Sequence, residues 1–342
     1  MSDMNAYLKN GIWSANSIVK NLSGSTANYS VANGKWTNSG VALNNTNMFK
    51  IYSDVDQILS VSGSDINLNS TKIPVGPKSW NYIAYLPTGS MDLKTALADY
   101  PAKDGDVIKS NDGFAMYYGN EWIGSLRSMQ PNFGYMLKNT GDTCSFRYPS
   151  SSSSLRSAQT VKASSYESNM SIIASAPEKR EGDVLRALVG NMENDVVEVA
   201  LDDRALQFIS VSANAGDKVR FTMERDGVVY EANNALSFSN DAVYGTPDQP
   251  FVLNFNLGGV ESLTVYPNPM VDVLNVSGRV DGDDDVTFEL FDVVGALIFE
   301  KRVAVSDNVL DENVNVTGLV PGSYMLKVRQ GDDLKVFKVV KK

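Results

Sequence analysis

The stretch Gly322-Ser323-Tyr324-Met325-Leu326-Lys327-Val328 decides the fold of the C-terminal part of this 342-residue chain. Tyr324, Leu326 and Val328 recur at every second position, which is the period of a β-strand with one face in a core and the other in water. Earlier segments repeat this alternation, with Leu274 and Val276, then Val286, Phe288 and Leu290, then Leu297 and Phe299. Turn sequences separate the segments, at Asp281-Gly282, Val294-Gly295, Pro321-Gly322 and Gly331-Asp332. The pattern predicts a small antiparallel β-sandwich over residues 262–342.

Three motifs of this region occur in a definite order at the C-terminus. They are Tyr266-Pro267-Asn268-Pro269 after a short strand, the strand from Gly322 to Val328, and a basic end, Lys338-Val339-Val340-Lys341-Lys342. In this arrangement the region resembles the type A C-terminal sorting domain of the type IX secretion system, which exports proteins across the outer membrane of Bacteroidota. The resemblance implies an Ig-like, seven-stranded antiparallel β-sandwich.

The resemblance also implies roles for individual residues. The sorting signal would comprise Tyr266, Pro267, Asn268, Pro269, Gly322, Tyr324, Leu326, Lys327, Val328, Lys338, Val339, Val340, Lys341 and Lys342. Its partners would be the secretion machinery, namely the outer-membrane translocon and the shuttle or attachment proteins. The protein would pass through the periplasm and become secreted or cell-surface, and a cut near Leu257-Gly258-Gly259 would remove the sorting domain.

The composition excludes several classes of function. The chain has no histidine and a single cysteine, Cys144, so an intrachain disulfide and a cysteine-rich zinc site are excluded. A net charge of −10 argues against nucleic-acid binding, because a phosphate backbone requires a basic surface. No apolar run approaches the length of a transmembrane helix. The start, Met1-Ser2-Asp3-Met4-Asn5, lacks the apolar core of a signal peptide, so we expect a piece of a longer precursor.

The acidic residues do not indicate a catalytic or metal centre. Asp281, Asp283, Asp284 and Asp285 crowd one turn, but their spacing lacks the position-12 glutamate of an EF-hand, which favours a solvated turn over a calcium site. Asp202-Asp203 and Asp332-Asp333 are expected at hairpin tips. We therefore expect no enzyme, no catalytic residues and no cofactor in this chain.

An internal repeat of about eighty-eight residues occupies the N-terminal half and suits tandem modules. The matched segments are Ile18-Val19-Lys20 with Val107-Ile108-Lys109, Trp36 with Trp122, and Phe49-Lys50 with Leu137-Lys138. The first copy, residues 1–53, lacks the segment equivalent to Ile73–Leu86, so we expect a truncated array. The second copy, residues 54–149, is complete.

The complete module is predicted to be β-rich with one short helix. Trp80–Pro87 has the composition of a buried strand, and Met91–Tyr100 has apolar residues at helical spacing between a capping Ser90 and a terminating Pro101. Three strands are expected to follow, at Asp106–Ile108, Phe114–Tyr118 and Tyr135–Leu137. Through Trp80-Asn81-Tyr82-Ile83 and Gly105-Asp106-Val107-Ile108-Lys109-Ser110 the module resembles a repeat of large surface proteins exported by the same system.

Residues 150–165 are a predicted linker, because five consecutive serines begin it. Residues 166–256 are predicted to form a middle β-sandwich, and residues 257–261 a second linker. The expected strands of the middle domain are Met170–Ala174, Asp183–Gly190, Gln207–Val211, Lys218–Met223, Val228–Glu231 and Phe251–Phe255.

All four tryptophans lie in the repeat region, which gives two interpretations of its aromatic residues. Trp80, Tyr82, Tyr117, Tyr118 and Trp122 could form a flat platform that stacks sugar rings. Alternatively, one tryptophan per repeat anchors a small core, and the equivalence of Trp36 and Trp122 favours this interpretation.

Taken together, the sequence predicts the C-terminal fragment of a large secreted or cell-surface protein, an adhesin or a stalk, with an export signal at its end. Its ligand would be a surface glycan or a host or matrix component. The alternative is a glycan-binding accessory region, with a sorting domain, that belongs to a secreted polysaccharide-degrading enzyme or protease. Further repeats upstream would support the first hypothesis, and exposed coplanar aromatic rings or an upstream catalytic domain the second.

Overall fold

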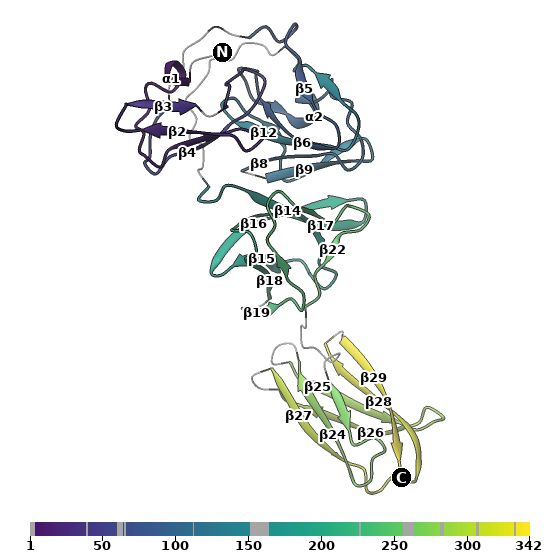
Figure 1. Cartoon of the computed structure of the whole chain (residues 1–342). Coiled ribbons are helices and arrows are strands. Elements are labelled where there is room, and N and C mark those ends of the chain that lie inside the picture. The colour runs from purple at the N-terminus through teal and green to yellow at the C-terminus, as the bar shows by residue number, and fades with distance from the viewer. Residues whose placement is uncertain are drawn as a thin grey trace. The chain divides into compact units, whose positions relative to one another are not determined.

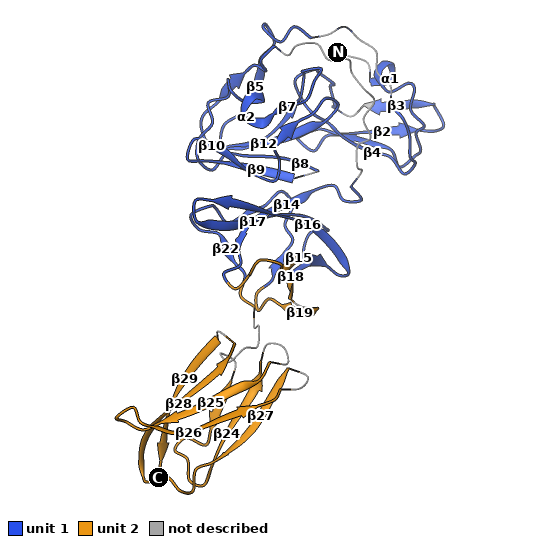
Figure 2. Ribbon diagram, turned by 180° about the vertical axis from the view of Figure 1, so that it is seen from behind, with its two compact units in different colours: residues 1–177, 186–220, 235–253 blue, residues 178–185, 221–234, 254–342 orange. Residues whose placement is uncertain are grey.

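The computed structural model describes residues 4–38, 40–59, 64, 66–111, 113–150, 164–225, 227–255, 263–280, 284–305, 308–331 and 333–342. The chain divides into two compact units, which are described separately (Figure 2). Unit 1 comprises residues 1–177, 186–220 and 235–253, and unit 2 comprises residues 178–185, 221–234 and 254–342. The described residues are mainly β, which confirms the predicted fold class. No helix among them has the length and hydropathy to cross a membrane.

The N-terminal sheet of unit 1 has four antiparallel strands in the order β3-β2-β1-β4 (Figure 1). The elements are α1 (Met4–Tyr7), β1 (Ile18–Lys20), β2 (Thr26–Ser30), β3 (Lys35–Asn38) and β4 (Lys50–Tyr52). Its small core includes Val19, Ala27 and Trp36, with Leu8 packed beside them.

The second sheet of unit 1 has five antiparallel strands in the order β10-β9-β8-β12-β6. The elements of this region are β5 (Ile73–Val75), β6 (Ser79–Ala84), β7 (Met91–Asp92), α2 (Leu93–Ala96), β8 (Val107–Ser110), β9 (Gly113–Tyr118), β10 (Glu121–Gly124), β11 (Ser128–Met129), β12 (Gly134–Asn139) and β13 (Cys144–Phe146). Ile83, Ile108 and Leu137 face a core that also contains Phe146. Alternate residues of the same strands face the other way, because side chains alternate along a strand.

The predicted helix is much shorter than expected. The helical residues are only Leu93–Ala96, and the N-cap is Asp92 rather than Ser90. The Asp92 carboxylate accepts hydrogen bonds from the backbone N–H groups of Lys94 and Thr95. The Ser90 hydroxyl instead donates to the carbonyl of Met129 at 3.2 Å. The prediction of one short helix in this module is therefore confirmed, whereas its predicted extent, Met91–Tyr100, and its predicted cap were wrong.

The two sheets share strand order and register. β3-β2-β1-β4 corresponds to β10-β9-β8-β12. Val19 pairs with Ala27 as Ile108 pairs with Ala115, and Trp36 pairs with Tyr29 as Trp122 pairs with Tyr117.

The register also corrects one of the matches made from the sequence. Val19 lies opposite Ile51, and Ile108 lies opposite Leu137, so Ile51 and Tyr52 occupy the places of Leu137 and Lys138. The match of Phe49-Lys50 with Leu137-Lys138 was wrong by two residues. A shift of two leaves the alternation of faces unchanged, and the pattern alone therefore could not detect it.

The strands between residues 169 and 252 vary from two to ten residues and are mostly antiparallel. They are β14 (Asn169–Ser175), β15 (Val184–Val189), β16 (Met192–Leu201), β17 (Arg204–Ser212), β18 (Lys218–Arg225), β19 (Val228–Glu231), β20 (Leu236–Ser237), β21 (Val243–Tyr244) and β22 (Phe251–Val252). β17 pairs with β14 and β16, while β21 and β22 pair with β14 in parallel. Asp202-Asp203 forms the tip between β16 and β17, as predicted. β16 was not among the predicted strands.

A shared core joins the second sheet to β14, β16 and β17 within unit 1. Phe114 and Met116 of β9 pack with Ile173 of β14 and Phe208 of β17. The Phe114 and Phe208 ring centroids are 5.2 Å apart. The face of the sheet opposite Ile83 and Ile108 is therefore covered by protein.

The C-terminal sandwich lies in unit 2. The strands described between residues 263 and 342 are β23 (Thr264–Tyr266), β24 (Val273–Arg279), β25 (Val286–Phe291), β26 (Leu297–Val303), β27 (Val309–Asn315), β28 (Gly322–Gln330) and β29 (Asp333–Lys341). They form one sheet in the order β23-β24-β27 and another in the order β26-β25-β28-β29 (Figure 1). This arrangement agrees with the predicted seven-stranded antiparallel sandwich.

The core of the sandwich follows the predicted alternation with one exception. The inward residues are fully buried, namely Leu274, Val276, Val286, Phe288, Leu290, Leu326 and Val328. Leu297 was expected in the core but is 51% exposed. The register between β25 and β26 shifts at Leu290/Phe291, so Phe299 takes the inward place opposite Leu290 while Leu297 lies beyond the irregularity.

Candidate functional site

The segment Tyr266-Pro267-Asn268-Pro269 carries the chain from one sheet of the sandwich to the other. β23 ends at Tyr266 after pairing with β24. Both prolines, which follow cis peptide bonds, lack the N–H that would continue this ladder. Met270 then pairs in parallel with Lys341 of β29, in the other sheet. The motif is therefore a sheet switch, and it places Met270 beside the terminal strand.

Asn268 contacts the terminal strand through both ends of its side-chain amide. Its Nδ2 donates to the backbone carbonyl of Lys338 at 2.9 Å, and its Oδ1 accepts from the backbone N–H of Val340 at 2.9 Å. These two backbone partners fix which end of the amide is oxygen.

Met270 and Val271 extend the contact to the end of the chain. The Met270 N–H donates to the Val340 carbonyl at 2.7 Å, and the Lys342 N–H donates to the Met270 carbonyl at 3.0 Å. The largely buried Lys341 donates from Nζ to the carbonyl of Val271. We call these contacts of residues 268–271 with residues 338–342 the terminal clasp.

The predicted strand motif of β28 lies directly beside the terminal clasp. Gly322 pairs with Lys341, and Tyr324 pairs with Val339. Tyr324 is buried, and its hydroxyl donates a hydrogen bond to the Val320 carbonyl at 2.8 Å. Leu326 and Val328 point into the core, whereas Lys327 points away from it and lies over the Phe291 ring at 4.5 Å.

The structure thus brings together motifs that are some seventy residues apart in the sequence, since Asn268 and Lys338 are separated by 70 positions. Tyr266 lies at the margin of this group, and its ring is half-exposed. Met270, which is fully buried, was not among the residues predicted for the sorting signal. The signal that could have found it is an apolar residue directly after the last proline. The sorting role of these residues stays a prediction.

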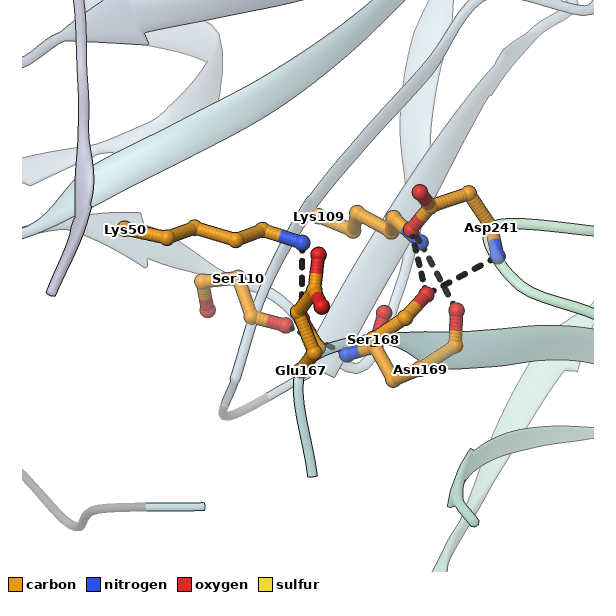
Figure 3. Close-up of polar contacts among 7 residues, drawn as sticks. All are labelled: Lys50, Lys109, Ser110, Glu167, Ser168, Asn169 and Asp241. Carbon is orange, nitrogen blue, oxygen red and sulfur yellow. Dashed lines mark hydrogen bonds and ion pairs between the residues drawn. The ribbon is translucent and has the colours of Figure 1, made fainter. Parts of the chain in front are cut away.

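A second polar cluster lies in unit 1 around a buried lysine (Figure 3). The Lys109 side chain is 1% exposed. Its Nζ donates to the Asn169 carbonyl at 2.8 Å and to Asp241 Oδ1 at 2.7 Å, and it lies 4.8 Å from the centroid of the Trp80 ring. Burial lowers the pKa of Lys109 to about 8, although the Asp241 carboxylate opposes this shift.

Neighbouring groups complete this Lys109 cluster. Ser168 donates from its hydroxyl to Asp241 Oδ1 at 2.8 Å, and Asn169 Nδ2 donates to the Ser110 carbonyl at 2.8 Å. Lys50 reaches the same segment from β4 and donates to the Glu167 carbonyl at 2.7 Å (Figure 3). The cluster links β4 and β8 to the start of β14, so its partners are structural groups of the protein. Lys109 was predicted only as a member of a repeat motif, and not as the centre of a polar cluster.

The five aromatic residues proposed as a sugar platform are divided between two faces of the second sheet. Trp80 and Tyr118 pack on the core shared with β17, and Tyr82 lies on the same face as Trp80. Trp122 packs on the opposite core, and its ring meets Tyr117 edge-on, at 66° with centroids 5.2 Å apart. All five are half-buried. They do not form a single flat surface, and glycan contact stays a prediction.

One of these residues, Tyr82, lines a shallow hollow in unit 1. The hollow has a volume of about 240 Å³ and is lined by Asn21, Leu22, Asn47, Met48, Phe49, Pro74, Gly76, Asn81 and Tyr82. The lining side chains are amide, aliphatic, thioether and aromatic groups. Lys50 Nζ lies 5.7 Å from the centroid of the Tyr82 ring.

Acidic residues do not gather into a metal centre in the described parts of the chain. No group of three or more Asp, Glu, Cys or His side chains there is arranged to hold a metal ion. Asp281 and Asp283 lie outside the described residues, as do Asp332 and the predicted cut at Leu257-Gly258-Gly259. Asp285 forms an ion pair with Arg302 at 2.8 Å.

Comparison with known proteins gives one family match. Residues 264–342 match the family described as "Secretion system C-terminal sorting domain". The match spans the sheet switch, β28 and the terminal clasp. No curated protein matches the sequence. A crystal structure of dimeric latent PorU from Porphyromonas gingivalis is similar over 78% of this chain at 10% identity, with a TM-score of 0.20, and the match covers 32% of that chain.

Proposed function

We propose that this chain is the C-terminal part of a surface protein that is exported across the outer membrane. A type A sorting domain would be its export signal. The family match at residues 264–342 carries this proposal. A C-terminal sorting domain implies export by the type IX secretion system, a secreted or cell-surface destination and contact with the secretion machinery. Passage through the periplasm and an origin in Bacteroidota belong to the proposal.

The preceding modules would then be the passenger, an adhesin or a stalk. The shared order and register of β3-β2-β1-β4 and β10-β9-β8-β12 support tandem copies of one module. The Lys109 cluster and the core around Phe114 and Phe208 support a passenger in which the second module and the following strands form one compact body. We propose no enzymatic activity for it.

The export role is tested with a fusion protein. Residues 262–342 contain their own buried core, so they are fused to a fluorescent protein that carries a signal peptide. In a strain with a type IX secretion system, the fusion should reach the cell surface, as scored by protease accessibility on intact cells. A matched fusion without residues 338–342 should remain in the periplasm. Periplasmic retention of the complete fusion would refute the proposed function.

A second candidate function for the passenger is binding of a neutral glycan. The hollow beside Tyr82 favours it, because amide groups and aromatic rings without a lining charge suit the hydroxyls and apolar face of a sugar. Its volume suits a single sugar unit rather than a long chain. We expect binding of the full chain to neutral glycans on an array, lost in Tyr82→Ala and kept in Tyr117→Ala. Equal binding by both variants would exclude this hollow.

A further inference from the structure

We propose that Asn268 is a positioning residue for the terminal strand, so that the sorting signal is a folded surface made by both ends of the domain. This inference rests on the proposed function in export. The alternative is a linear signal, in which the machinery reads residues 338–342 as a peptide and Asn268 only helps the domain to fold.

The terminal strand needs such support because of its place in the sheet. β29 is an edge strand in the order β26-β25-β28-β29, and among the strands that the structure describes only β28 pairs with it along its length. Residues at a chain end that are held on one side alone tend to fray. The other side of β29 carries a row of backbone N–H and C=O groups, which face solvent unless another segment pairs with them.

The terminal clasp occupies the last groups of this row. These backbone groups belong to Lys338, Val340 and Lys342 and point away from β28. Each of them bonds to residue 268 or residue 270. The Lys338 carbonyl, the Val340 N–H and carbonyl, and the Lys342 N–H are all paired in this way. The clasp therefore sets both the position and the register of the terminal residues.

The chemistry of the site explains why residue 268 is an asparagine. Its amide offers an acceptor to one backbone group and a donor to the next, as a neighbouring strand would. Aspartate would keep the acceptor for Val340 but would place a carboxylate oxygen against the Lys338 carbonyl. Pro267 and Pro269 restrict the backbone on both sides of Asn268. The unfolded chain therefore has fewer conformations there, and ordering Asn268 costs less entropy.

The test uses the full 342-residue chain behind a signal peptide in a strain with the secretion system. Asn268→Ala removes both side-chain bonds and Asn268→Asp removes one. The matched control is Asn275→Ala, because Asn275 Nδ2 also donates to a backbone carbonyl of the sandwich, that of Tyr266 at 3.0 Å, without contacting β29. Val276→Ala is added as a variant that destabilises the core away from the clasp.

Export, amide hydrogen exchange and thermal unfolding are measured for each variant. In Asn268→Ala, exchange at Val340 and Lys342 should accelerate by about tenfold, the scale of one or two lost hydrogen bonds. The surface-exposed fraction should fall several-fold, with Asn268→Asp intermediate and Asn275→Ala at the wild-type level. Val276→Ala should lower the Tm at least as much as Asn268→Ala while it keeps higher export.

Two outcomes would overturn the positioning role. One is wild-type export by Asn268→Ala despite accelerated exchange at Val340. The other is export that follows the Tm across all variants, including Val276→Ala, which would assign Asn268 a merely structural role. Retention of the wild-type chain in the periplasm is a separate result that refutes the proposed function itself, and the export role of Asn268 with it.

Discussion

The N-terminal sheet and the second sheet of unit 1 share the order of four strands, but equivalent lysines in the two sheets differ in burial. Lys20 and Lys109 occupy corresponding places, since each follows the residue that pairs with Ala27 or Ala115. Lys20 is 33% exposed and pairs with Glu167 at 2.5 Å, whereas Lys109 is 1% exposed and pairs with Asp241. The local sequence sets the strand and its register. The surface that packs on the strand determines whether the same cation is solvated or buried.

This difference has an energetic consequence. A solvated ion pair such as that of Lys20 contributes little, because water and salt screen it. A buried ammonium has lost its hydration and depends on the groups that replace water, here the Asn169 carbonyl and Asp241. Removing the lysine from each sheet should therefore give very different results.

The largest effect is expected for Lys109→Ala. The substitution leaves the Asn169 carbonyl and the Asp241 carboxylate without their main partner, and the loss of one member of a buried pair costs about 3–5 kcal/mol. Lys20→Ala is the matched control and should change the free energy of unfolding by less than about 1 kcal/mol. Chemical denaturation followed by tryptophan fluorescence measures both, because all four tryptophans lie in unit 1. Equal losses of unfolding free energy in the two variants would show that the difference in lysine burial does not affect stability.

A smaller effect is expected from pH. The folded chain releases the Lys109 proton near pH 8, whereas the unfolded chain keeps it to about 10.5. The unfolded state therefore binds more protons between these values, and stability rises with pH across the window. We expect a gain of about 2 kcal/mol between pH 7.5 and pH 10, on the scale of 1.4 kcal/mol per pKa unit.

The measurement is the denaturation midpoint at intervals of pH, with Lys109→Met as the comparison. The wild type and Lys20→Ala should show the full rise. Lys109→Met should lose most of it and keep only the part that comes from Lys50, whose pKa is also lowered by burial. Above pH 10 the trend should reverse, because burial raises the pKa of Tyr82 and Tyr85, and the unfolded chain loses these protons first. A rise that persists in Lys109→Met would assign the pH dependence to another group.

Strong alternation made much of the fold predictable. β24, β25 and β28 were found because most of their inward residues are apolar. β27 was missed because Glu312, opposite Val276, interrupts the inward series with a charge that pairs with Lys301. β16 was missed because its residues are mostly exposed, and pairing with β15 and β17 rather than burial defines it.

The candidate site was predictable only in parts. Each motif could be located from residue type alone, since Tyr266–Pro269 and Lys338–Lys342 differ in composition from their surroundings. That Asn268 bonds to Lys338 and Val340 depends on the register of β29 and on the sheet switch, which join residues far apart in the chain. The burial of Lys109 likewise depends on Asn169 and Asp241, which no local pattern links to it.

The smallest effect concerns the aromatic pairs that the two sheets share. Tyr29 meets Trp36 at 5.6 Å and 69°, and Tyr117 meets Trp122 at 5.2 Å and 66°. Edge-to-face pairs are worth about 1 kcal/mol beyond their burial. Double-mutant cycles with leucine at both positions of each pair, followed by circular dichroism, should give similar coupling energies in the two sheets. A coupling near zero in one sheet would mean that the shared register does not preserve the interaction, and the case for two copies of one module would weaken.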